Sequence, residues 1–136
     1  MNFFLDNNLP PRLARALNIL SEPDGHSVVP FIDKCSDDNI KDVDWINELS
    51  KESDWVIITN DKQISKNAYE RKAWLESGLT IFFLEKGWGN LHFWIVAWKL
   101  IKWWPDIINQ AIKIKSNVGY RIPVTGKKMT IMDLSR

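Results

Sequence analysis

Two short apolar runs in this chain each close on an aspartate. Residues 2–5 are followed by Asp6, and residues 55–60 are followed by Asp61. If the two runs are neighbouring parallel strands, both aspartates lie at the edge of the sheet where open α/β folds bind their ligands. Carboxylates gathered at one edge repel one another unless they are protonated or neutralised by a cation. The pattern therefore predicts a site for a divalent metal ion.

Other side chains with catalytic potential form no recognisable motif. Cys35 is the only cysteine, which excludes an intramolecular disulfide, and it shares no zinc-ligand spacing with His26 or His92. The glycines at 87 and 89 do not follow the first strand, so they do not form a phosphate-binding loop. No serine stands in a nucleophile elbow. Any chemistry must therefore come from carboxylates, which also cluster in residues 37–44.

The elements that must position these acids alternate between strand and helix. Apolar runs predict strands at 2–5, 27–32, 55–59 and 80–84. Helical periodicity predicts helices at 9–20, 43–53, 66–77 and from 91 onwards, where Pro105 is expected to separate a further helix at 106–115. Residues 120–125 and 129–132 have the pattern of a terminal hairpin. This order predicts a three-layer α/β/α sandwich with a mostly parallel sheet.

Length and composition indicate an ordinary globular protein. The 136 residues suit one domain, 1–136, and 45% of them are hydrophobic. The net charge of +1 provides no global attraction to nucleic acid or membrane. Lysines and Arg121 are nevertheless concentrated in residues 99–128. This basic flank either brings a polyanion to the metal or is simply a solvated face.

The sequence indicates a cytosolic protein. The first apolar run lacks a basic region before it and is interrupted early by Asp6, so it is not a signal peptide. The apolar stretch 91–104 contains Lys99 and Lys102 and is shorter than the roughly 20 residues that a membrane span needs.

Eight tryptophans are many for this length. Trp94, Trp98 and either Trp103 or Trp104 recur near helical spacing. The stripe is expected to pack on the sheet, and the alternative is an exposed patch for a partner or a second copy of the chain. Trp88, in a loop between two glycines, is the tryptophan most expected to be partly exposed.

Residues 4–17, which read FLDNNLPPRLARAL, resemble the FLxDENLPPRLARAL opening of small PIN-like nuclease domains linked to toxin–antitoxin modules. The resemblance continues in order along the chain, through residues 42–46, 55–61, 70–71, 84, 104–107 and 120–122. Over nearly its whole length the chain is similar to the PIN-like domain of VapC-type toxins.

This resemblance implies a metal-dependent ribonuclease whose acidic positions are Asp6, Asp42 and Asp61. Oxygen ligands of this kind select Mg²⁺ or Mn²⁺. Such a cation makes a water molecule acidic enough to attack a phosphodiester and stabilises charge on the phosphate oxygens. Asp6 and Asp61 would be direct ligands, and Asp42 would hold the metal through water or orient the nucleophile.

Further residues are candidates for the same site. Asp44 or Glu48 would replace Asp42 after a small change of register. Glu70 is a candidate fourth acid, or else an ordinary helix residue. Arg12 and Lys62 are candidate phosphate contacts.

One departure from the family pattern bears on activity, because the glutamate that usually follows the first aspartate is Asn7 here. Asn7 favours an alternative in which the domain has lost catalysis and serves as a binding module. A second alternative is a phospho-acceptor receiver domain, but Glu85 stands near the place where that class needs Ser or Thr. The expected partners are an RNA substrate, a small antitoxin protein bound near residues 88–104 or at the terminal hairpin, and a second copy of the chain in a homodimer.

Overall fold

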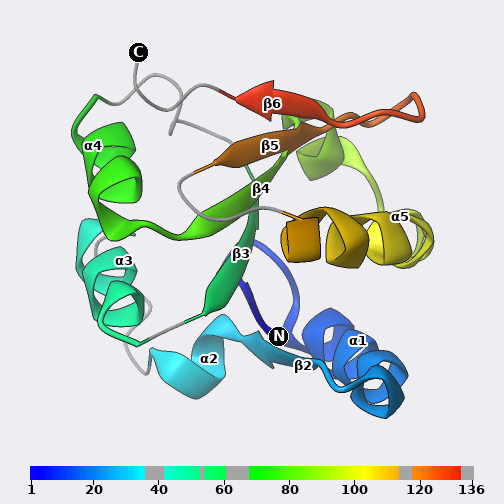
Figure 1. Ribbon diagram of the computed structural model, residues 1–136. Helices are drawn as coiled ribbons and strands as arrows, with labels where there is room; N and C mark the ends of the chain where they lie inside the picture. Colours follow the sequence, from blue (N-terminus) through cyan, green and yellow to red (C-terminus); the bar gives the residue numbers. More distant parts are fainter. Residues whose placement is uncertain (36–41, 53, 61–67, 114–117, 133–136) are drawn as a thin grey trace.

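The computed structural model of the protein describes residues 1–35, 42–52, 54–60, 68–113 and 118–132, with only the backbone described at 42 and 43. Within these residues a six-stranded sheet lies between two layers of helices (Figure 1). The predicted α/β/α sandwich is therefore confirmed.

The sheet has the strand order β2-β1-β3-β4-β5-β6. Its first five strands are parallel, and β6 pairs with β5 in the antiparallel direction. The predicted terminal hairpin is thus present with shorter strands. The strands are β1 (Asn2–Leu5), β2 (Ser27–Pro30), β3 (Trp55–Asn60), β4 (Thr80–Leu84), β5 (Gly119–Ile122) and β6 (Thr130–Met132).

Helices α1 (Pro11–Ser21) and α5 (Phe93–Lys113) cover one face of the sheet, and α3 (Asp42–Ser50) and α4 (Ala68–Ser77) cover the other (Figure 1). A single turn of helix, α2 (Phe31–Lys34), follows β2. Two 3₁₀ segments complete the described elements, η1 (Glu22–Asp24) and η2 (Lys86–Asn90).

Each face of the sheet has its own apolar core, because successive side chains of a strand point to opposite faces. In β1, Phe3 and Leu5 join the core under α1 and α5, whereas Phe4 joins the core under α3 and α4. Strands β3 and β4 contribute to both cores in the same way. These strands are buried on both faces, which is why they appear in the sequence as continuous apolar runs.

The expectation that Pro105 separates two helices is wrong, because α5 runs through it without interruption. A proline inside a helix removes one backbone hydrogen bond, here the one to the carbonyl of Ile101. Pro105 is exposed and Ile101 is 40% exposed, so both lie on the outer side of the helix. Solvent can satisfy a carbonyl there, and the core face of α5 continues unbroken.

The tryptophans differ from expectation in two respects. Trp88 is only 2% exposed, and its indole N–H donates to the carbonyl of Ile122 at 3.2 Å. Trp104 packs in the core as expected, but Trp94 and Trp98 are 73% and 50% exposed. The helical stripe is therefore split between the core and the surface.

In the described part of the chain, every helix is too short or too polar to cross a membrane.

Gly78 ends α4 and has φ of +72°, a conformation that costs a residue with a Cβ atom about 1–2 kcal/mol. A Cβ atom at this position would meet no heavy atom within 4 Å, so the cost of substitution is backbone strain alone. We expect Gly78→Ala to lower the free energy of unfolding by about 1 kcal/mol in urea denaturation. Gly89→Ala, equally free of contacts but without positive φ, should change it by less than about 0.5 kcal/mol.

Candidate functional site

Asp6 lies directly after β1 and is only 5% exposed. Its Oδ2 accepts a hydrogen bond from the hydroxyl of Thr59 at 2.5 Å, and its Oδ1 accepts one from the backbone N–H of Asn7 at 2.6 Å. The carboxylate is therefore held in one orientation at the carboxyl edge of the sheet.

The two apolar runs of the sequence are neighbouring parallel strands, as predicted. Leu5 of β1 pairs with Ile58 of β3, and the N–H of Asp6 donates to the carbonyl of Ile58 at 3.0 Å. This register puts Asp6 beside Thr59, which is 1% exposed. Strand β3 ends one residue later at Asn60, and Asp61 is the next residue in the sequence.

The side chain of Asn60 adds an oxygen to this edge. Its Oδ1 is buried and accepts no hydrogen bond from the residues that the structure describes. Asn60 also lines a cavity of about 250 Å³ at the carboxyl edge, together with Asn8, Phe93 and residues of η2. A buried carbonyl oxygen without a donor is costly unless a ligand or an ion satisfies it.

The sequence-predicted acids have different positions. Asp61 and Lys62 lie outside the described residues, and of Asp42 the structure gives only the backbone, as the first residue of α3. The alternative acids Asp44 and Glu48 are exposed on α3.

Glu70 is half-buried in the first turn of α4. Helix α4 packs beside α3 over the same face of the sheet.

Arg12 is exposed in the first turn of α1, where its guanidinium lies 3.5 Å from the centre of the Phe93 ring.

The Cys35 thiol is affected by charged groups from more than one segment of the chain. Burial raises its pKa, and the negative charges of Asp6 and Glu48 raise it further, whereas Lys34 opposes the shift. Asp6 and Glu48 therefore both act electrostatically on the same half-buried group.

Three residues at this edge have no role in the sequence-based site. Thr59 orients Asp6, and Asn60 contributes an oxygen without a donor. Glu85 directly follows β4. Because Leu84, the last residue of β4, pairs with Asn60 of β3, Glu85 lies at the same carboxyl edge of the sheet as Asn60. The signal for Glu85 is present in the sequence, since it follows an apolar strand as Asp6 does.

Among the described residues, no group of three or more histidine, cysteine, aspartate or glutamate side chains is arranged to hold a metal ion. The donors that are described nevertheless fit a hard cation. The buried carboxylate of Asp6 offers oxygen ligands of the kind that such a cation prefers. The free oxygen of Asn60 is a ligand of the same class.

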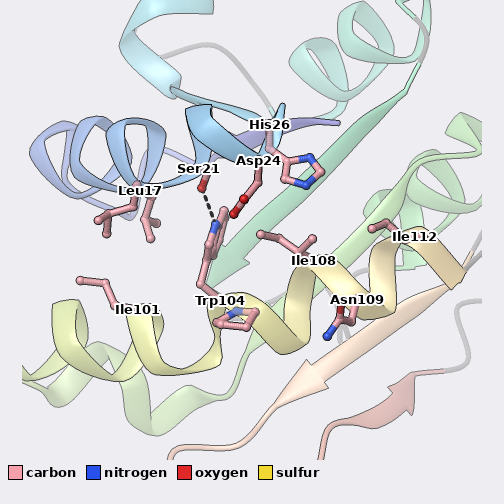
Figure 2. Close-up of a pocket in the computed structure, with 11 residues that line it drawn as sticks. Leu17, Ser21, Asp24, His26, Ile101, Trp104, Ile108, Asn109 and Ile112 are labelled. Atoms are coloured by element: carbon pink, nitrogen blue, oxygen red, sulfur yellow. Dashed lines mark hydrogen bonds between the residues drawn. The ribbon is translucent and has the colours of Figure 1, made fainter.

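A second hollow lies between α1 and α5, at the opposite end of the parallel strands (Figure 2). It has a volume of about 460 Å³ and is lined mainly by apolar residues of the two helices. Inside it, the indole N–H of Trp104 donates to the hydroxyl of Ser21 at 2.8 Å. We refer to this hollow as the α1–α5 groove.

His26 lines the α1–α5 groove and lies 3.0 Å, through Nδ1, from the amino group of Met1. Partial burial and the charge of that amino group lower the pKa of His26, while Asp24 opposes the shift. The α1–α5 groove is therefore lined mainly by apolar side chains, with Asp24 and His26 as its titratable groups.

The chain matches the family model described as a PIN like domain over residues 1–86, which is more than half of its length. No curated protein matches the chain. No solved structure matches it either. The matched region contains β1 to β4 and with them the edge formed by Asp6, Thr59 and Asn60. The chain therefore belongs to the PIN-like domain family.

Proposed function

We propose that this protein is a metal-dependent endoribonuclease that hydrolyses single-stranded RNA at the carboxyl edge of its sheet. The observation that carries the proposal is the buried Asp6 carboxylate, fixed by Thr59 and placed beside the strand that leads into Asp61. Membership of the PIN-like family, in which nucleases are common, supports the same reaction.

In this proposal Asp6 and Asp61 bind Mg²⁺ or Mn²⁺ directly, and Asp42 acts through water. When bound, the ion would supply a more acidic water molecule and positive charge beside the phosphate. Thr59 keeps Asp6 oriented, and burial of the carboxylate limits its access to bulk water. Asn60 is an additional oxygen donor, and Glu70 and Glu48 are the candidate further acids.

The finer form of the proposal is that the enzyme is the VapC-type toxin of a toxin–antitoxin pair. It rests on the resemblance of residues 4–17 to that group. A small antitoxin would need apolar surface, which is available in the α1–α5 groove and at Ile131 of the terminal hairpin, 73% exposed. A homodimer would compete for the same surfaces.

The second candidate function is a PIN-like binding module without catalysis. Asn7 favours it, because the side chain at that position is exposed and cannot supply a negative charge. Its backbone N–H still supports Asp6. The receiver-domain alternative gains no support, since the chain belongs to the PIN-like family.

The reaction is tested by incubating the protein with total RNA and with transfer RNA, with Mn²⁺ or with EDTA. We expect internal cleavage only in the presence of the metal. Cleavage that persists in EDTA would contradict the metal-dependent mechanism. Intact RNA in the presence of bound Mn²⁺ would favour the binding module instead.

Metal binding has its own readout. Because the cation relieves repulsion between clustered carboxylates, Mn²⁺ at about 100 times its Kd should stabilise the fold by about 2.7 kcal/mol and raise the melting temperature. Calorimetric titration of Asp61→Asn should show severely weakened binding. Asp33→Asn, which changes an exposed acid paired with Arg15, is the matched control and should bind Mn²⁺ normally. Equal affinity in Asp61→Asn and the unmodified protein would remove Asp61 from the site.

A further inference from the structure

The first half of α5 exposes large aromatic side chains. Trp94 is 73% exposed and Trp98 is 50% exposed, one helical turn apart on the same side of the helix. Phe93, half-buried, contacts Trp94 with ring centres 5.2 Å apart. Tryptophan is normally well buried, so adjacent exposed indoles indicate a binding surface. We call Phe93, Trp94 and Trp98 the aromatic platform.

Cations are interleaved with these rings. The guanidinium of Arg12 lies 3.5 Å from the centre of Phe93 and 5.8 Å from that of Trp94. The ammonium groups of Lys99 and Lys102 lie 5.3 Å and 6.0 Å from the Trp98 ring. Lys99 also donates to the carbonyl of Val124 at 3.0 Å, which holds its charge in place.

The positive charge of this surface is not neutralised locally. The sequence has no aspartate or glutamate between Glu85 and Asp106. Within the described ranges, the salt bridges involve other residues than Arg12, Lys99 and Lys102. An anionic ligand with flat apolar groups is therefore complementary to the platform.

The platform is continuous with the carboxyl edge of the sheet. Phe93 lies under the guanidinium of Arg12 and also lines the cavity that contains Asn60 and Asn8. A chain bound on Trp94 and Trp98 can thus extend past Phe93 towards Asn60, the residue before Asp61. The surface and the candidate nuclease edge form one path.

We propose that the aromatic platform binds single-stranded RNA, with bases stacked on Trp94 and Trp98 and phosphates at Arg12, Lys99 and Lys102. This inference rests on the proposed nuclease function and identifies how its substrate is held. Aromatic stacking combined with a basic track is the usual way in which proteins bind single strands without sequence preference.

The spacing favours a single strand over a duplex. Residues four apart in an α-helix are separated by about 6 Å along its axis, whereas stacked bases are about 3.4 Å apart. Bases on Trp94 and Trp98 must therefore be unstacked from each other. An extended single strand can adopt that spacing, and a duplex cannot without losing its own stacking.

The test measures binding separately from cleavage. Fluorescence anisotropy of a labelled oligouridine of about twelve nucleotides is recorded in EDTA, so that the probe stays intact. We expect Trp94→Ala and Trp98→Ala each to weaken binding by about 5- to 150-fold, the effect of losing one base–aromatic stack. Trp94→Phe, which keeps a stacking ring, should retain most of the affinity. Lys102→Ala should remove one phosphate contact. The plot of the logarithm of the association constant against the logarithm of the salt concentration should then become less steep by about 0.7.

Two matched controls lie outside the platform. The first is Arg15→Ala, the control for Arg12→Ala, which should weaken binding. Arg15→Ala removes the same charge from the same helix, but Arg15 is paired with Asp33. Tyr69→Ala removes a ring that is 71% exposed on α4, in the opposite helix layer. Both controls should bind the probe within about twofold of the unmodified protein, because neither touches the aromatic platform.

Unchanged affinity in both tryptophan variants would overturn the proposal. So would equally tight binding of poly-L-glutamate with the same sensitivity to Trp94→Ala, which would assign the surface to an acidic protein. Loss of binding in the variants, together with no cleavage by any form of the protein, would support the platform and reject the nuclease. Metal-dependent cleavage with the same KM in Trp94→Ala, Trp98→Ala and the unmodified protein would support the nuclease and reject the platform.

Discussion

Asp6→Asn should abolish the metal-dependent cleavage of RNA. The substitution removes a negative charge from the only described aspartate that is both buried and fixed by hydrogen bonds at the carboxyl edge. Loss of a group that merely supports a metal ligand reduces activity or affinity by about 10- to 100-fold, and loss of a direct ligand should cost more. We therefore expect a reduction of at least about 100-fold in the rate of cleavage at saturating Mn²⁺.

The same variant should remain folded, which makes the loss of activity interpretable. An asparagine side chain fits the space of Asp6 and can still accept one of the two hydrogen bonds from Asn7 and Thr59. Its melting temperature should be measured beside that of Asp33→Asn, in which the same chemical change affects an exposed acid of α2. Wild-type cleavage by folded Asp6→Asn would remove this residue from the reaction.

Trp45→Ala should have the largest effect on stability. Trp45 is 1% exposed in α3, and its ring lies 5.3 Å from Phe4, 6.2 Å from Phe31 and 5.4 Å from Trp74, measured between ring centres. One side chain thus joins α3 to β1, α2 and α4. Truncation of a buried tryptophan costs about 3–5 kcal/mol, a large part of the total stability of a domain. We expect the melting temperature to fall by about 10 °C or more.

The matched control for this prediction is Trp94→Ala, the same substitution at a residue that is 73% exposed. Its free energy of unfolding in urea should change by less than about 0.5 kcal/mol. Similar losses in both variants would contradict this prediction, because alanine is the better helix former at both positions and Trp94 has no such buried cluster around it.

The sequence was sufficient to predict most of the fold because hydrophobic periodicity carries the information. Continuous apolar runs identify β1, β3 and β4, because a strand that is buried on both faces lacks the alternating polar residues of a half-exposed strand. The same pattern implied parallel pairing and hence the common edge of Asp6 and Asp61. It could not show that Pro105 lies inside a continuous helix, because that depends on the exposure of the proline in the folded protein.

The candidate site could be predicted only in part, because hydrogen-bond partners depend on register. The pairing of Leu5 with Ile58 determines that the hydroxyl of Thr59 reaches Asp6. Trp88 was expected near the surface because it lies between glycines, but its indole reaches the carbonyl of Ile122 in a strand more than 30 positions away. Such long-range contacts leave no local signal in a single sequence.

The bond between Thr59 and Asp6 joins positions 53 apart, and α5, which covers the core beneath β1, ends only at Lys113. Contacts of such long sequence separation form slowly, because the intervening chain must lose its freedom before they contribute stability. During synthesis, β1 is made before β3, and it has no neighbour on its β3 side until residue 55 has been made. The carboxyl edge is therefore assembled late, and we expect the protein to gain its function only after the chain has been translated beyond α5.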